Sequence, residues 1–250
     1  MFNFFAEKEN RLGNNYIIDG ADYNHIKNVL RMEIGDTCLI SCDGSSDLCR
    51  IESIGDESVS LEILEENYTD TELAVKIYLF QGLPKGDKME YIIQKCVELG
   101  VFSIIPTEMK HCIVKLDDKK AKQKQSRWQS ISESAAKQSK RNIIPEIMPV
   151  CSYGKALEFA KTLDLVLVPY ENAEGMTATT NALAQLKTAK SVGIFIGPEG
   201  GFEKTEIEKA IESGAKIISL GKRILRTETA AITATAMCML NIEASESQGN

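Results

Sequence analysis

The second part of the chain alternates short apolar segments with helix-like segments, and this alternation limits the possible folds more than any other feature. The apolar segments are "VKIYLF", "SIIPTEM", "DLVLVPYE", "SVGIFIG" and "AKIISLG". Around them lie "DKMEYIIQKCVELG", "AKQKQSRWQSISESAAKQS", "YGKALEFAK", "EKTEIEKAIESG" and "TAAITATAMCMLNIEA". Such alternation predicts an α/β fold with a mostly parallel sheet and helices on both faces.

The first 70 residues have a different pattern. Three short β-like runs, "TCLISC", "LCRIESI" and "SVSLEIL", are separated by the turn-forming segments "DGSSD" and "GDE". This pattern predicts a small β-rich module. A chain of 250 residues has room for one large domain or two. We therefore expect a β-rich domain over residues 1–70 and an α/β domain over residues 71–250.

The charge is unevenly distributed along the chain. The net charge is -7, and residues 1–70 hold 5 basic and 15 acidic side chains, whereas residues 110–141 hold 10 basic and 3 acidic ones. An acidic protein with one basic stretch suits a partner that is a polyanion and touches a limited face. A solvated helix face would give the same charge run. Charge alone leaves both interpretations open.

Targeting and metal signals are weak in this sequence. The N-terminus "MFNFFAEKENR" has no apolar run of signal-peptide length, and no run of about 18 apolar residues occurs. We therefore expect a cytoplasmic protein without a membrane contact. Seven cysteines occur without a C-x-x-C pair, and the only histidines are His25 and His111. This favours reduced, mostly buried thiols and no metal site.

The stretch "IFIGPEGGFEKTEI", residues 194–207, leads from an apolar strand through a glycine-rich loop into a helix. In open α/β sheets, ligands bind beyond the carboxyl ends of the strands, and glycine lets the backbone approach a ligand closely. The loop matches neither the Walker pattern nor G-x-G-x-x-G. Taken alone, the loop favours a structural turn over a binding loop.

Two further strand ends strengthen the interpretation as a pocket. The segment "LGKRILRTETAAITATAM", residues 220–237, again leaves an apolar strand through a short loop and enters a helix of small residues. The segment "LVLVPYENAEG", residues 165–175, offers a third strand end. Loops that follow neighbouring parallel strands lie at one edge of the sheet. Together the three segments favour a cofactor pocket.

These segments resemble a known family. "IGPEGGF" together with "LGKRILRTETA" is similar to the C-terminal signature of the SPOUT methyltransferases. Within that superfamily the chain resembles the ribosomal small-subunit methyltransferase E family, bacterial enzymes that methylate N3 of a uridine in 16S ribosomal RNA. "HIKNVLRMEIGD", "KGDKMEYIIQKCVELGV", "ESAAKQSKRNIIPEI" and "LVPYEN" extend the resemblance over nearly the whole chain.

The resemblance implies a PUA-like N-terminal domain and a SPOUT domain with a trefoil knot. It also implies S-adenosylmethionine as the cofactor, 16S rRNA of the small ribosomal subunit as the partner, and a homodimer formed through the last helix. The cofactor-binding positions that it implies are Pro169, Ile196, Gly197, Pro198, Gly200, Gly201, Leu220, Gly221, Ile224, Leu225 and Thr229.

The chemistry of the implied reaction suggests catalytic roles. A uridine N3 carries a proton, so methylation needs a cation or donor near the carbonyl oxygens and a proton acceptor. Arg226 is the candidate for stabilising the anion, and Glu228 and Glu171 are candidate acceptors. Glu228 is equally consistent with a structural brace. Glu199 is expected to hold the glycine loop in place and not to take part in the chemistry.

The RNA must present an unpaired uridine, because base pairing hides its N3 edge. The family motifs place candidate RNA contacts at Arg31, Gln138, Lys140 and Arg141, whereas Trp128 is expected to anchor the core. Two alternative functions differ in the features that they require. A dehydrogenase or nucleotide-dependent enzyme needs a phosphate-binding loop and an acidic ribose ligand, and neither is found. A catalytically silent RNA-binding or ribosome-assembly factor would keep the same fold.

Overall fold

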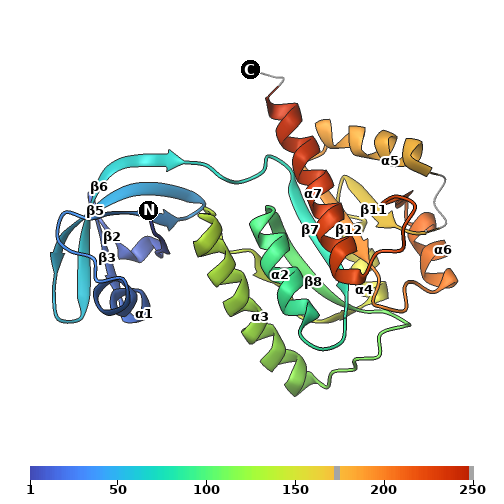
Figure 1. Cartoon of the computed structure of the whole chain (residues 1–250), viewed down its shortest axis with the longest axis horizontal. Coiled ribbons are helices and arrows are strands. Elements are labelled where there is room, and N and C mark those ends of the chain that lie inside the picture. Colours follow the sequence, from blue (N-terminus) through green and yellow to red (C-terminus); the bar gives the residue numbers. More distant parts are fainter. Residues whose placement is uncertain (172–174, 248–250) are drawn as a thin grey trace. The chain divides into compact units, whose positions relative to one another are not determined.

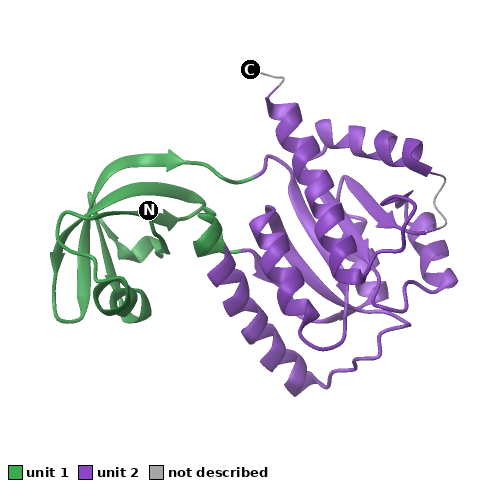
Figure 2. Ribbon diagram, viewed as in Figure 1, with its two compact units in different colours: residues 1–72, 136–144 green, residues 73–135, 145–250 purple. Residues whose placement is uncertain are grey.

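The computed structural model of the chain describes residues 1–171 and 175–247. The chain forms two compact units, which Figure 2 shows in different colours. Unit 1 contains residues 1–72 and 136–144, and unit 2 contains residues 73–135 and 145–250. The chain therefore leaves unit 1, builds part of unit 2, returns to unit 1 for nine residues and then completes unit 2.

Unit 1 is built on a six-stranded sheet with the order β1-β4-β5-β6-β3-β2. Its strands are β1 (Asn3–Phe5), β2 (Arg11–Leu12), β3 (Asn15–Asp19), β4 (Thr37–Cys42), β5 (Ser45–Ile54) and β6 (Ser58–Thr69). Neighbouring strands are antiparallel except for β1 and β4. The helical segments are η1 (Lys8–Asn10), α1 (Gly20–Asn24) and η2 (His25–Val29). The β-rich prediction for this part of the chain is confirmed.

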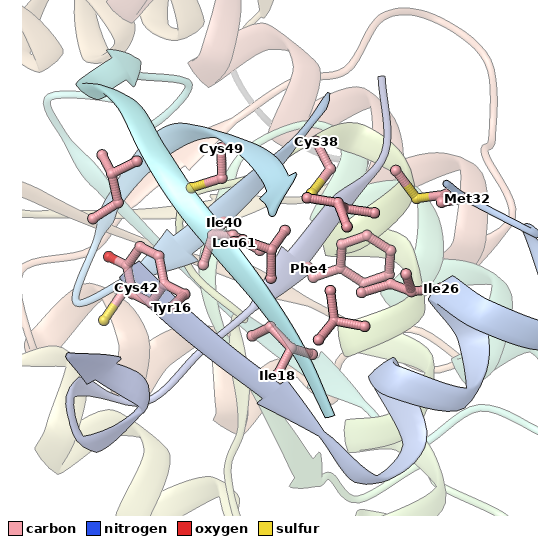
Figure 3. Packing of buried hydrophobic residues seen from close by; sticks show 13 residues of the cluster. Phe4, Tyr16, Ile18, Ile26, Met32, Cys38, Ile40, Cys42, Cys49 and Leu61 are labelled. Atoms are coloured by element: carbon pink, nitrogen blue, oxygen red, sulfur yellow. The ribbon is translucent and has the colours of Figure 1, made fainter. Parts of the chain in front are cut away.

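The core of unit 1 forms where the inward-facing residues of these strands meet the short helical segments (Figure 3). Phe4, Ile26 and Ile40 are almost completely buried there. Burial of such side chains contributes roughly 1.5–3 kcal/mol each. Tyr16 is also buried, and its hydroxyl donates a hydrogen bond of 2.9 Å to Asp47 Oδ2. The pKa of Tyr16 is raised above its ordinary value, mainly because the hydroxyl is buried and secondly because it donates to the Asp47 carboxylate.

Residues 136–144 are held in unit 1 by a buried ion pair. The guanidinium of Arg141, whose side chain is only 3% exposed, pairs with Glu72, and its Nε donates to Glu72 Oε1 at 2.9 Å. The same carboxylate accepts from the backbone N–H of Asn142 at 2.9 Å. The charge of Arg141 is buried against an internal carboxylate, and this placement does not support the prediction of Arg141 as an RNA contact.

Unit 2 contains a parallel sheet with the order β10-β8-β7-β12-β11-β13, and β9 pairs with β8. The strands are β7 (Lys76–Gly82), β8 (Val101–Glu108), β9 (Glu146–Ile147), β10 (Cys151–Ser152), β11 (Leu165–Pro169), β12 (Ser191–Ile196) and β13 (Lys216–Ile218). All the pairings are parallel. The alternation in the sequence thus predicted this sheet correctly.

Helices cover both faces of this sheet (Figure 1). They are α2 (Lys88–Glu98), α3 (Asp118–Ser139), α4 (Tyr153–Ala160), α5 (Gly175–Leu183), α6 (Lys204–Glu212) and α7 (Thr227–Glu246), with a short turn η3 (Ala184–Lys187). Successive residues of a strand point to opposite faces. Tyr78 and Phe80 of β7 accordingly contact Phe159 of α4, whereas Gln81 reaches Thr227 of α7 on the other face, where α7 packs against α2.

The cysteines lie within these two units as free thiols, six of them buried and Cys151 half-buried. Burial raises the pKa of Cys38, Cys96 and Cys238 to about 12. These three thiols therefore stay protonated at neutral pH, and the prediction of mostly buried thiols is confirmed. Within residues 1–171 and 175–247, no helix is long and apolar enough to cross a membrane. The same residues contain no cluster of three or more metal-binding side chains.

Candidate active site

The three glycine-containing loops meet at one edge of the parallel sheet of unit 2. Strands β11, β12 and β13 are neighbours, with β11 in the middle, so their carboxyl ends lie together. The loops that follow them enclose a pocket of about 560 Å3, which also includes the first turn of α7 and Lys88 at the start of α2. The expectation that separate strand ends face one another around a pocket agrees with this arrangement.

Most of the predicted cofactor positions line this pocket. They are Pro169, Ile196, Gly197, Pro198, Gly200, Gly201, Leu220, Gly221, Ile224 and Leu225. Thr229 does not line it and is exposed on α7. The lining residues of that helix are Thr227 and Ala230, which are three positions apart and therefore share one face. Thr229 lies on a different face of the first helical turn, so its assignment as a cofactor contact stays a prediction.

The loop after β12 folds tightly because it contains glycine. A Cβ at Gly197 would lie 3.1 Å from the carbonyl carbon of Gly201, and the Gly201 N–H donates to the Pro198 carbonyl at 2.9 Å. Gly201 has a φ of +67°, in the left-handed region that favours glycine, and no heavy atom lies within 4 Å of where its Cβ would be. Its backbone therefore borders open space on the pocket side of the loop.

A buried chain of hydrogen bonds fixes the start of this loop. The Thr227 hydroxyl donates to the Gly197 carbonyl at 2.7 Å and accepts from Gln81 Nε2 at 2.9 Å. Both Thr227 and Gln81 are buried. No sequence motif assigns a role to these two residues. The available signal was a polar residue at the end of an apolar strand, in "VKIYLFQG".

Glu199 holds the middle of the loop, as the sequence analysis suggested. Its Oε1 accepts from the Lys85 N–H at 3.0 Å and from Lys88 Nζ at 2.8 Å. Burial alone would raise the pKa of Glu199, but the hydrogen bonds from Lys88 and Lys85 outweigh it and lower the pKa below the ordinary value. The hydrogen bond to Glu199 correspondingly raises the pKa of Lys88. On the other side of the loop, His111 Nδ1 lies 3.0 Å from the Gly200 carbonyl oxygen.

The candidate catalytic residues lie at two places around the pocket. Arg226 and Glu171 line it and are exposed at its rim. Glu228 instead borders a neighbouring depression, and Lys88 lines both the pocket and this depression. Lys88 Nζ lies 3.9 Å from Glu228 Oε2, and that oxygen has no hydrogen-bond partner among the described residues. Sequence reasoning did not single out Lys88, because a lysine in "KGDKMEY" carries no signal of its own.

All four candidate RNA contacts lie on unit 1, and Arg141 is the buried one among them. Arg31, Gln138 and Lys140 are all exposed, and the last two belong to the segment that returns to this unit. Trp128 is 3% exposed and anchors the core, as expected. Within the family motif "LVPYEN", Asn172 lies outside the described residues.

The fold and the pocket together define a class of protein: a two-unit α/β protein with a small-molecule pocket at the carboxyl ends of three adjacent parallel strands. Family comparisons agree with this class. An RNA methyltransferase domain matches residues 71–239, and an RNA methyltransferase PUA domain matches residues 18–64. The chain therefore belongs to the RNA methyltransferase family, with a PUA-like domain before its methyltransferase domain.

Individual relatives are similar over nearly their full length. Ribosomal RNA small subunit methyltransferase E of Bacillus subtilis is 41% identical over 224 residues, which cover 88% of this chain and 87% of the relative. The enzyme of the same name from Neisseria gonorrhoeae, whose crystal structure has S-adenosyl methionine bound, is 33% identical in sequence. The two structures match with a TM-score of 0.80 over 94% of this chain and 95% of the other. The structure of a Legionella pneumophila methyltransferase in complex with SAM is 31% identical in sequence and matches with a TM-score of 0.82, over 96% of this chain and 97% of the other. The family resemblance seen in the sequence is confirmed.

Proposed function

We propose that this protein transfers a methyl group from S-adenosylmethionine to N3 of a uridine in 16S ribosomal RNA of the small ribosomal subunit. The observation that carries the proposal is the pocket at the ends of β11, β12 and β13, in a chain whose relatives are named for this activity. The alternative of a catalytically silent assembly factor is not favoured, because each relative described above is named as a methyltransferase.

The pocket residues fit S-adenosylmethionine as the methyl donor. Three glycines of the loop after β12, Gly197, Gly200 and Gly201, line the pocket with backbone atoms only, and a Cβ at Gly201 would enter open space. Pro169, Ile196 and Leu225 add apolar surface. When bound, the sulfonium supplies an already activated methyl group, so the protein has to align the reactants and manage charge.

Arg226 and one carboxylate complete the proposed chemistry. As uridine N3 loses its proton, negative charge spreads onto the carbonyl oxygens, and the guanidinium of Arg226 at the pocket rim stabilises it. Glu228 and Glu171 are the two candidate acceptors of the N3 proton. Glu228 is favoured by its Oε2, which lacks a hydrogen-bond partner among the described residues. Lys88, which pairs with Glu199, adds a second cation beside Glu228.

We further propose that unit 1 contributes the RNA contacts. Arg31, Gln138 and Lys140 are exposed on it, and the matched PUA domain spans Arg31. Phosphate contacts of this kind give affinity without sequence specificity. The proposed partner is the small ribosomal subunit or its rRNA, and the proposed location is therefore the cytoplasm.

The resemblance also leads us to propose a homodimer and a trefoil knot. Helix α7 is apolar well beyond one face, and Leu240 on it is 59% exposed, which suits burial against a second copy. Light scattering at micromolar concentration tests the dimer, and a monomer there would refute it. The knot would involve the loops that lead into α7.

Two measurements test the main proposal. Isothermal titration should give binding of S-adenosylmethionine and no response to NAD or ATP. Mass spectrometry of ribosomal RNA nucleosides should detect 3-methyluridine in 16S rRNA only when the protein is present. Cofactor binding without any change in the nucleosides would refute the proposed substrate while leaving the pocket in place.

A further inference from the structure

A second depression adjoins the cofactor pocket in unit 2. It has a volume of about 560 Å3, and the first two turns of α2 form most of its lining. The lining residues are Asp87, Lys88, Glu90, Tyr91, Gln94, Ile131 and Glu228. Lys88 lines both this depression and the cofactor pocket, so the two adjoin at that side chain. Any molecule that lies in the second depression is therefore next to the proposed methyl donor.

The side chains of the depression suit a flat heterocycle with polar edges. Tyr91 is 49% exposed, an unusual exposure for a large aromatic side chain at the edge of a concave site. Gln94 lies three residues further along α2, so its amide is on the same face as the ring and offers both donors and an acceptor. Ile131 of α3 adds an apolar wall. Bases stack on aromatic rings of this kind whatever their sequence context.

Glu228 supplies the second observation. Its side chain is only 17% exposed, and its Oε2 is buried without a hydrogen-bond partner among the described residues. A buried acceptor without a donor is costly, so this oxygen is suited to a donor that arrives with a ligand. Lys88 Nζ, 3.9 Å away, provides a cation for a ligand oxygen beside that donor. An N–H flanked by carbonyl oxygens matches this pair, and the N3 edge of uracil has that pattern.

We propose that the depression is the subsite for the target base, in which an unstacked uracil ring lies on Tyr91 with its N3–H directed to Glu228. This inference rests on the proposed function and extends it, because it assigns the base to one side of Lys88 and the methyl donor to the other. Gln94 contacts the polar edge of the base. RNA contacts on unit 1 then supply affinity, and this subsite selects a flat base with an imide edge.

The test compares Tyr91→Ala and Tyr91→Phe with wild type, with Ile211→Ala as the matched control. Ile211 is 53% exposed and lines neither depression. Single-turnover methylation of small-subunit RNA is measured against RNA concentration at saturating S-adenosylmethionine. Loss of a stacking ring should raise the half-saturating RNA concentration about fivefold to a hundredfold in Tyr91→Ala. Tyr91→Phe keeps the ring and should stay within about twofold of wild type, as should Ile211→Ala.

Cofactor titration and light scattering accompany the kinetics. The dissociation constant for S-adenosylmethionine should be the same in all four proteins, because Tyr91 does not line the cofactor pocket. The proposal is overturned if Tyr91→Ala methylates RNA like wild type, or if Tyr91→Phe is as impaired as Tyr91→Ala. It is also overturned if Tyr91→Ala changes the oligomeric state, because the ring would then belong to an interface between copies.

A separate measurement keeps this inference distinct from the proposed function. If wild type binds S-adenosylmethionine but methylates no RNA, the proposed function fails. Uridine 5′-monophosphate is then titrated into wild type and Tyr91→Ala, each saturated with S-adenosylhomocysteine. Binding by wild type that weakens in Tyr91→Ala supports the base subsite, and equal binding or none in the two proteins overturns it.

Discussion

Thr227→Val is the substitution whose effect the structure defines best. The Thr227 side chain is buried, donates to the Gly197 carbonyl at 2.7 Å and accepts from Gln81 Nε2 at 2.9 Å. Valine has nearly the same shape but no hydroxyl, so it opens no cavity and removes both hydrogen bonds. The Gly197 carbonyl loses its donor, and Gln81 keeps only its contact with the Gly82 carbonyl at 2.9 Å.

The magnitude follows from the groups left without partners. A buried polar group that loses its partner costs about 1–3 kcal/mol. Gln81 Oε1 also lacks a partner among the described residues, but it is an acceptor and cannot replace the donor that the Gly197 carbonyl loses. For a protein of this size, each kcal/mol lowers the melting temperature by about 2–4 °C, so we expect a decrease of roughly 2–12 °C. Affinity for S-adenosylmethionine should fall as well, because Gly197 lines the pocket.

Differential scanning calorimetry and isothermal titration check this expectation. Thr227→Ser is the control, because it keeps the hydroxyl and removes only a methyl group. It should retain most of the melting temperature and cofactor affinity of wild type. The reasoning is refuted if Thr227→Val melts within about 1 °C of wild type and binds the cofactor equally well, since the buried hydrogen bonds would then contribute nothing.

Four further predictions concern single side chains. Gly201→Val should abolish S-adenosylmethionine binding with the fold retained, as measured by calorimetric titration. The control is Gly214→Val, at a glycine that also has a left-handed backbone and open space around it but lies away from the pocket; this substitution should only lower the stability of the protein. Arg226→Ala should slow single-turnover methylation about a hundredfold to a thousandfold with the cofactor bound, and a loss below about tenfold would exclude the proposed role. Lys140→Ala should weaken RNA binding and flatten its salt dependence without changing cofactor affinity, as measured by filter binding at several salt concentrations. The pKa of Glu199 is lower in the folded protein than its ordinary value of 4.5, so the carboxylate stabilises the loop fully above pH 4.5 and loses this effect as the pH falls further. Cofactor affinity should therefore decrease below about pH 4.5 in wild type, and Glu199→Gln should lack this decrease.

The sequence predicted the fold of unit 2 and the position of its pocket for the same physical reason. Apolar runs of strand length that alternate with amphipathic helices leave a parallel sheet as the arrangement that buries both. Because the strands are parallel, the loops that follow neighbouring strands must lie at one edge. Positions such as Gly197, Gly221 and Pro169 could therefore be assigned to one pocket before the order of the strands was known.

Periodicity could not reveal pairings between residues distant in sequence. Arg141 ends a basic stretch and resembles a phosphate contact, but its partner Glu72 is 69 residues away. Lys88 and Gln81 were missed for the same reason, because each gains its role from a contact with a residue more than 100 positions later. A motif gives the neighbourhood of a helix start but not its rotation, so it did not indicate that Thr227 and Ala230, and not Thr229, line the pocket.

Hydrogen bonds from other parts of unit 2 hold the glycine loop after β12 in a fixed conformation, although glycine itself favours a flexible backbone. Glycine allows close approach to a ligand, but it also gives the backbone the greatest conformational freedom to lose. The loop is attached to three different elements: Thr227 of α7 holds Gly197, Lys88 of α2 holds Glu199, and His111 after β8 holds Gly200. These attachments restrict the loop before any ligand binds, which lowers the entropic cost of binding. The polar residues that sequence motifs do not mark are thus what makes the glycine motif usable as a pocket.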